Sequence, residues 1–206
     1  MTEWVDPDYA GGDSDGTESK PWLTITDALF TGNVLVEAGS THAITAKKAI
    51  SGQTFTLGEN GTGTDPIINI NVVNDYGIQL VNPTCTIENV SLETTITHDG
   101  SNDAVFAIEM RGTTAVNATL QNFNVSGTRF GVGITPNTTI IESLVIKDGA
   151  ISDNWTDNIL IAEAQNLEIS GMTLNTPGQN TATNDGDNIQ LVNTVNDMAN
   201  VSIHDN

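Results

Sequence analysis

Basic residues are scarce in this chain of 206 residues, in which six Lys and Arg stand against 26 Asp and Glu for a formal net charge of −20. Such a surface repels nucleic acid and anionic lipid, which argues against a nucleic-acid or membrane partner. An acidic surface with only four Lys suits high salt, where screening relieves the self-repulsion, so we expect a halophilic or marine source. An ordinary acidic extracellular protein is the alternative.

Cysteine and long apolar runs are also nearly missing. Cys85 has no partner for an internal disulfide, and we interpret it as a small core residue rather than a nucleophile. No apolar run approaches the roughly 18 residues that a membrane span needs. Residues 1–6 show no basic or apolar segment of a signal peptide. A virion protein, made in the cytoplasm and released by lysis, would reconcile this start with a composition typical of extracellular proteins, and so would a recombinant mature chain.

Aromatic residues make up only 5% of the chain, whereas Thr, Asn and Gly are abundant, with 29 Thr, 23 Asn and 19 Gly. This mixture disfavours helices and favours strands joined by many turns. It excludes a coiled coil and a helical bundle. The 37% of apolar residues argue against wholesale disorder.

One short pattern recurs along the chain: apolar, any, small or Asn, apolar, any, apolar. The copies begin at Ile87, Leu120, Ile141, Ile169 and Ile203, at spacings of 33, 21, 28 and 34 residues. A second series interleaves with the first, and its copies centre on Ile78, Ile108, Ile134, Ile159 and Ile189. Two strand series with one average period indicate an internal structural repeat.

A repeat of about 25 to 30 residues with short strands and no helix is typical of one coil of a solenoid. Equivalent strands of successive coils then pair in parallel, about 4.8 Å apart. Asn89, Asn122, Ser143 and Gly171 should occupy one turn position, where stacked Asn side chains can bond to one another. The apolar members of the first series should all be buried: Ile87, Val90, Leu120, Phe123, Leu144, Ile146, Ile169 and Met172.

The opening segment and the repeats resemble the right-handed parallel β-helix of pectate-lyase-like proteins, including viral tail-spike and fibre β-helices. The Gly- and Asp-rich segment 4–20, followed by Pro21-Trp22-Leu-Thr24-Ile25, is similar to the start of many such proteins, and residues 61–73 resemble an early coil. The resemblance implies an all-β fold, with an opening loop and capping helix over 1–33 and coils over 34–206. Because the chain stops inside a strand at residues 201–206, we expect a truncated end or a covering partner.

The capping helix has local support. Thr24 is placed to cap its N-terminus, Asp27 follows at the third position, and Gly32 follows its end. Trp22, Ile25 and Leu29 would form its apolar face. We therefore expect an amphipathic plug that covers the first coil.

Carboxylates are the main candidates for chemistry. Asp157 and Asp187 each precede a strand Ile of adjacent coils by two residues, so they should stack, with Asp185 nearby. Paired carboxylates can act as acid and base in glycoside hydrolysis. The run Asn184-Asp185-Gly186-Asp187 loosely resembles the Asn-x-Asp-Gly signature of polygalacturonase-like hydrolases, yet Asp-Gly is also a common turn. Catalysis, cation binding and a plain turn all stay open for these residues.

Two further clusters of charged residues are candidate binding sites. Asp6, Asp8, Asp13 and Asp15 crowd the opening loop, where they are candidate calcium ligands or simply a solvated acidic turn. The cations Arg111, Arg129 and Lys147 are candidates for a small basic patch or are scattered surface charges. A lyase acting on a polyanion needs positive charge at its site, and the net charge of −20 makes such a substrate improbable.

Two functions of different classes follow. The first is a non-enzymatic virion appendage, such as a tail spike or fibre, that presents a β-helix to host-surface polysaccharide or glycoprotein. A homotrimer attached to other virion proteins is implied by the resemblance to viral β-helix spikes. The alternative is a secreted polysaccharide-degrading enzyme, either a lyase or a glycoside hydrolase. The few basic residues and the incomplete catalytic set favour the first.

Overall fold

The computed structural model of the chain describes residues 1–96, 105–112, 116–134, 141–162, 164–175, 186–192 and 199–206. Within these ranges the regular structure is entirely β, with no helix. Among the same residues, therefore, no helix is long and apolar enough to cross a membrane.

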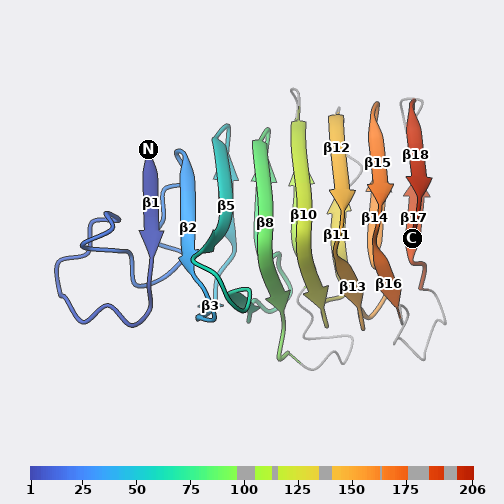
Figure 1. Cartoon of the computed structure of the whole chain (residues 1–206). Coiled ribbons are helices and arrows are strands. Elements are labelled where there is room, and N and C mark those ends of the chain that lie inside the picture. The colour runs from blue at the N-terminus through green and yellow to red at the C-terminus, as the bar shows by residue number, and fades with distance from the viewer. Residues whose placement is uncertain (97–104, 113–115, 135–140, 163, 176–185, 193–198) are drawn as a thin grey trace.

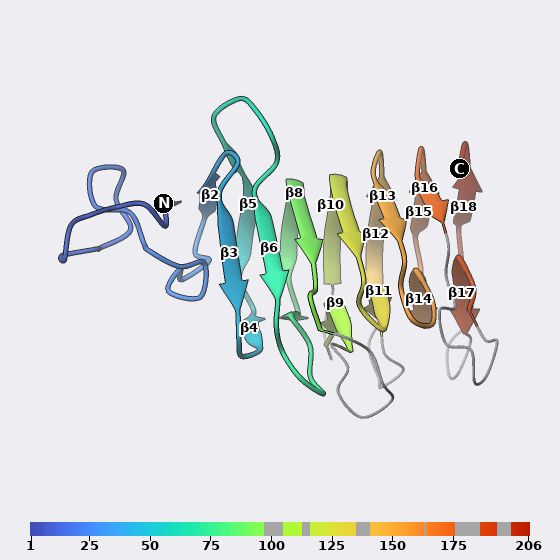
Figure 2. The same cartoon turned by 90° about the horizontal axis from the view of Figure 1, so that it is seen from below.

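The strands of the described residues form two parallel sheets, which wind as a β-solenoid of about six turns (Figures 1 and 2). The large sheet has twelve strands: β1 (Thr2–Val5), β2 (Asn33–Glu37), β3 (Thr41–Ile44), β5 (Thr54–Asn60), β6 (Ile67–Ile70), β8 (Thr84–Glu93), β10 (Val116–Ser126), β12 (Ile141–Lys147), β13 (Ala150–Ser152), β15 (Leu167–Ser170), β16 (Thr173–Asn175) and β18 (Val201–His204). The small sheet has six: β4 (Lys48–Ser51), β7 (Ile78–Val81), β9 (Phe106–Arg111), β11 (Phe130–Ile134), β14 (Ile159–Ala162) and β17 (Ile189–Val192). The expected all-β parallel solenoid is confirmed.

The first repeat series forms the main path of the large sheet, where β8, β10, β12, β15 and β18 lie side by side (Figure 1). Leu120 pairs with Ile87 as expected. The third copy is shifted, because Leu120 and Ile169 both pair with Ile146 rather than with Ile141. Residue 141 instead faces Val116, next to an irregularity in the register. The prediction of the copy at Ile141 was therefore wrong in register, although its strand and sheet are right.

The second series shows the same kind of shift at its third copy. Ile78 pairs with Ile108 and Ile159 pairs with Ile189, as predicted. Ile108 and Ile159 both pair with Val132, two residues before the expected Ile134. Both residues point inward on a strand of period two, so the pattern of apolar residues does not distinguish them.

A left-handed residue marks the bend within or directly after each strand of the first series. Asn89, Asn122, Asp148, Gly171 and Asp205 have φ values of 52°, 48°, 54°, 61° and 58°. Asn, Asp and Gly tolerate this conformation better than other residues, which explains their recurrence. Ser143 was wrongly assigned to this position, because the shifted register places Asp148 there.

The core is a column of apolar side chains between the sheets. All eight residues predicted to be buried are at most 2% exposed. Phe123 is wholly buried and lies opposite Val90 in the sheet. Large insertions between the strands leave this column intact, since each coil contributes its own inward residues.

The N-terminal cap is a turn rather than the predicted helix. Residues 25–27 form a turn, in which the Asp27 amide donates to the Thr24 carbonyl over 3.1 Å. The Thr24 hydroxyl donates to the Asp27 carboxylate over 2.8 Å. Ile25 is wholly buried, whereas Leu29 is 62% exposed, so the expected apolar helix face does not form.

Buried and half-buried side chains replace the helical hydrogen bonds of the cap. The Glu3 carboxylate, 3% exposed as a residue, accepts backbone N–H groups of Leu29 and Thr31 over 2.6 and 3.2 Å. The Lys48 ammonium donates to the carbonyls of Thr26 and Ala28, each over 2.7 Å. Because these charged groups satisfy the backbone of 26–31, the segment covers the first coil without a helix.

Candidate functional site

One position along the small sheet carries aromatic or acidic side chains in successive coils. It lies two residues before the inward Ile or Val of each strand, and the pairing of those residues aligns it from coil to coil. Its occupants in five successive coils, called the ladder here, are Tyr76, Phe106, Phe130, Asp157 and Asp187. The ladder thus passes from three aromatic rings to two carboxylates along the solenoid axis.

The aromatic part of the ladder is a continuous stack. The ring centroids of Tyr76 and Phe106 are 5.7 Å apart with a tilt of 33°, and those of Phe106 and Phe130 are 4.7 Å apart with 20° between planes. Phe106 is 2% exposed, whereas Tyr76 and Phe130 are half-buried. Gly133 makes room for the stack, because a Cβ there would lie 1.8 Å from the Phe106 ring.

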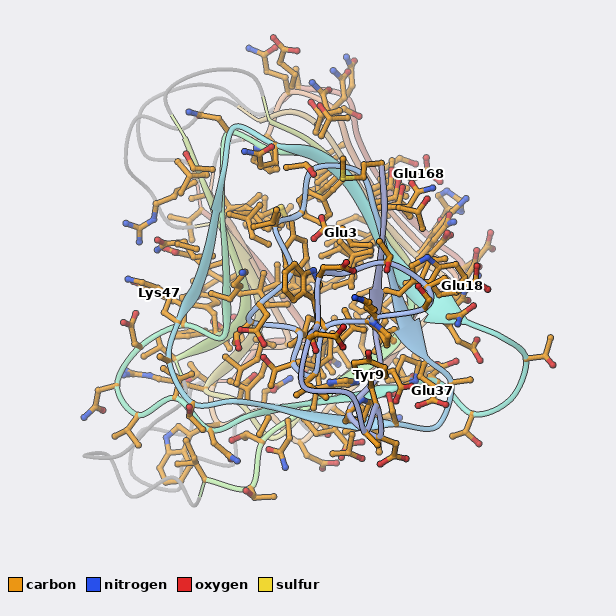
Figure 3. The ribbon with its side chains drawn as sticks, turned by 90° about the vertical axis from the view of Figure 1, so that its left-hand side faces the viewer. Glu3, Tyr9, Glu18, Glu37, Lys47 and Glu168 are labelled. Carbon is orange, nitrogen blue, oxygen red and sulfur yellow. The ribbon has the colours of Figure 1, made fainter. Side chains whose placement is uncertain are left out.

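Three of the chain's cations lie against these rings. The Lys47 ammonium is 5.6 Å and the Arg111 guanidinium 5.4 Å from the Tyr76 centroid, and Arg129 is 5.5 Å from that of Phe130. Figure 3 places Lys47 on one flank of the solenoid, away from Glu37 and Glu168. The expected patch of Arg111, Arg129 and Lys147 is corrected accordingly: Lys147 lies in β12 of the large sheet, and Lys47 stands in the patch instead.

A buried carboxylate fixes Arg111. Glu109 is wholly buried and accepts two hydrogen bonds of 3.1 Å from Arg111 Nε, besides a close contact with Nη2. Gln79 Nε2 donates to the same carboxylate over 2.6 Å. The hydrogen bond to Glu109 raises the pKa of Arg111 above its usual value. The guanidinium is therefore held in place beside the ladder, at little further entropic cost on binding a ligand.

The two acidic residues of the ladder lie side by side in adjacent coils, and their contact joins the Asp157 carboxylate to the backbone of Asp187. Asp157 is 3% exposed, and its Oδ1 accepts the backbone N–H of Asp187 over 2.8 Å. The Asp187 side chain is exposed. Both residues line a pocket of about 390 Å³ together with Phe130, Thr156 and Gln190. Asp185 lies outside the described residues. The hydrogen bond from Asp187 shows that Asp157 holds the next coil in place, and the exposed side chain of Asp187 borders the pocket.

The acidic side chains of the opening loop have partners of their own. The Asp13 carboxylate lies 2.5 Å from Lys20 Nζ and accepts the Tyr9 hydroxyl over 2.9 Å. Asp15 Oδ1 accepts the amide and hydroxyl of Thr17 over 3.1 and 2.7 Å.

The other two acidic residues of the opening loop interact with each other, since the Asp6 carboxylate accepts the backbone N–H of Asp8 over 2.7 Å. Among the described residues, no group of three or more His, Cys, Asp or Glu is arranged to hold a metal ion. Calcium at Asp6, Asp8, Asp13 and Asp15 stays a prediction.

The aromatic ladder was missed at the level of sequence, although the signal was present. The rule that selected Asp157 and Asp187, two residues before the strand Ile, also selects Tyr76 and Phe106. Applied to Val132 it selects Phe130, but the third copy was aligned on Ile134. This two-residue shift in register concealed a continuous row.

No protein-family model matches the chain, and neither the curated proteins nor the solved structures contain a significant match. The fold and the ladder are therefore the basis for any statement about function.

Proposed function

We propose that this protein is a non-enzymatic attachment protein of a virion whose β-helix binds cell-surface glycan along the ladder. The observation that carries the proposal is the row of Tyr76, Phe106 and Phe130. Tyr76 and Phe130 are half-buried, so part of the apolar surface of each ring stays open to the C–H groups of sugar rings, whereas Phe106 is buried in the stack. Asp187, whose exposed side chain follows in the same row, supplies acceptors for sugar hydroxyls.

The charges beside the ladder favour a neutral glycan. Lys47 lies 3.4 Å from the Asp75 carboxylate, and Arg111 is paired with Glu109. These cations are partly neutralised, and the net charge of −20 repels a polyanion at longer range. A neutral, hydroxyl-rich chain meets no such repulsion.

The virion setting and the homotrimer rest on the resemblance to viral tail-spike and fibre β-helices. A solenoid is stiff, because every coil is hydrogen-bonded to its neighbours, and so it can hold a binding surface away from a particle. Closed symmetry would present several weak glycan sites at once, which raises avidity without catalysis. The particle mass of the protein in solution, by analytical ultracentrifugation, should correspond to three chains.

Removal of the exposed rings tests the ladder. Tyr76→Ala and Phe130→Ala should each weaken binding to host-surface glycan by about tenfold, since each removes apolar ring surface that the glycan would contact. Tyr9→Ala, which removes an aromatic ring of the opening loop, is the matched control and should bind as the wild type does. Unfolding temperatures measured in parallel separate lost contacts from lost fold. Unchanged glycan binding by both folded ladder variants would overturn the proposal.

The pocket beside Asp157 and Asp187 supports a second candidate, glycoside hydrolysis. It would use one carboxylate as acid and the other as base or nucleophile. Under the main proposal, incubation with host-surface polysaccharide yields no new reducing ends and no unsaturated products. Steady turnover that disappears in Asp157→Asn or Asp187→Asn would establish the enzyme instead.

A further inference from the structure

The outer face of the large sheet carries a trough of its own, separate from the ladder. A hollow of about 430 Å³ lies over β2, β5, β8, β10 and the start of β12, and a second of about 190 Å³ lies over β12, β15 and β18. Ser143 lines both hollows, so they adjoin at β12, and together they are called the trough here. These seven strands lie side by side in Figure 1, and six steps of about 4.8 Å make the trough roughly 29 Å long.

Hydroxyl and amide side chains line this trough in register. Thr56, Thr86 and Thr119 face one another across three strands, and Thr84 pairs in the same way with Asn117. Hydroxyls of neighbouring strands therefore repeat at about 4.8 Å along the trough, and those two residues apart on one strand lie about 6.6 Å across it.

A line of side-chain amides extends the trough toward β18. Asn200 Nδ2 donates to Asn166 Oδ1 over 2.9 Å, and Asn166 Nδ2 donates to the Glu142 carbonyl over 2.6 Å. Asn117 Nδ2 donates to the Glu142 carboxylate over 3.4 Å. Hydrogen bonds thus connect these polar side chains from β10 to β18, and the side chains are held in place without a ligand.

The lining excludes two classes of ligand. Among the described residues that line the two hollows there is no Lys or Arg, so a polyanion finds no counter-charge. The strands β5, β8 and β10 are each paired on both sides, so the floor offers no free backbone edge to an extended peptide. The lining offers hydroxyls, amides, the Glu168 carboxylate and apolar groups, among them the Thr methyl groups, for recognition.

We propose that the trough binds one neutral polysaccharide chain lying parallel to the solenoid axis. A polyhydroxylated chain offers donors and acceptors at regular intervals, and the Thr methyl groups contact the apolar faces of its rings. This deepens the proposed function, on which it rests only in taking a glycan as ligand, and it places a second site on a different sheet.

The test uses Val in place of Thr, which removes a hydroxyl, keeps the shape and suits a strand. The triple variant Thr84→Val, Thr86→Val and Thr119→Val is compared with the triple variant Thr41→Val, Thr95→Val and Thr173→Val at exposed positions outside the trough. Mobility is measured in native gels that contain mannan, dextran, hydroxyethyl cellulose or alginate. We expect the wild type and the control to be retarded by at least one neutral polymer and not by alginate. The trough variant should bind about tenfold more weakly.

The outcomes separate the two proposals. If retardation is unchanged in the trough variant but lost in Tyr76→Ala and Phe130→Ala, the trough proposal fails and the ladder stands. If it is lost in the trough variant and kept in the ladder variants, the ladder fails and the trough stands. A trough variant of altered oligomeric mass would show an interface between copies and overturn the trough site. Retardation of the wild type by none of the neutral polymers would overturn both, and retardation by alginate alone would overturn the neutral ligand.

Discussion

Phe123 shows how strongly a single residue contributes to a solenoid core. It is wholly buried, and the neighbouring coil contributes Val90 beside it. Phe123→Ala should lower the free energy of unfolding by about 3 to 5 kcal/mol, because a cavity remains in the column. Reversible urea unfolding measures the loss.

The matched control is the outward residue two positions earlier. Gln121 is half-buried and donates to the Glu88 carboxylate over 2.6 Å on the surface of the sheet. Gln121→Ala and Glu88→Ala should each cost less than about 1 kcal/mol. A loss for Phe123→Ala as small as that would contradict the inward assignment.

At the scale of the element, the bends of the first-series strands are held by backbone conformation. Asn122 has φ of 48°, and β10 continues through it. Asn122→Val should lower the free energy of unfolding by about 1 to 2 kcal/mol, because a β-branched residue is strained there. Asn122→Gly, which fits the conformation, should cost little. Equal losses for both variants would point to the side chain rather than the backbone.

The ends of β1 and β2 bring two carboxyl groups together. The pKa of Glu37 is raised above its usual value by its hydrogen bond with Asp6, then by burial and by the charges of Asp6 and Asp8. A raised pKa in the folded state means that ionisation of Glu37 costs stability as pH rises through that value. Glu37→Gln should therefore raise the melting temperature at about pH 7, and the gain should shrink toward about pH 4. A gain that is independent of pH would contradict this pairing.

Charge acts at the scale of the whole molecule. With a net charge of −20, the folded chain repels itself, and salt shortens the range of that repulsion from about 10 Å at 0.1 M to about 3 Å at 1 M. The melting temperature should therefore rise with NaCl at neutral pH. The same series at about pH 4, where many carboxylates are protonated, is the control and should show a smaller rise. A melting temperature that does not respond to salt at neutral pH would argue against salt adaptation.

Much of the fold can be predicted from the sequence, because a solenoid repeats a local pattern. Period-two strands, their spacing and the left-handed Asn residues at 89 and 122 are all properties of short segments. These segments determine the inward residues and the parallel stacking of coils. They also bring Asp157 beside Asp187, since both hold the same place before a strand.

Only the tertiary structure decided the exact register and the partners of charged groups. Ile134 and Val132 both point inward, so the apolar pattern does not say which of them pairs with Ile108. The hydrogen bonds between coils pair Val132 with Ile108, and this register aligns Phe130 with Phe106. The cap has a helical pattern in sequence, yet the carboxylate of Glu3, more than twenty residues away, satisfies its backbone. Long-range hydrogen bonds of this kind have no local signature, because they depend on which groups the packed coils bring within reach.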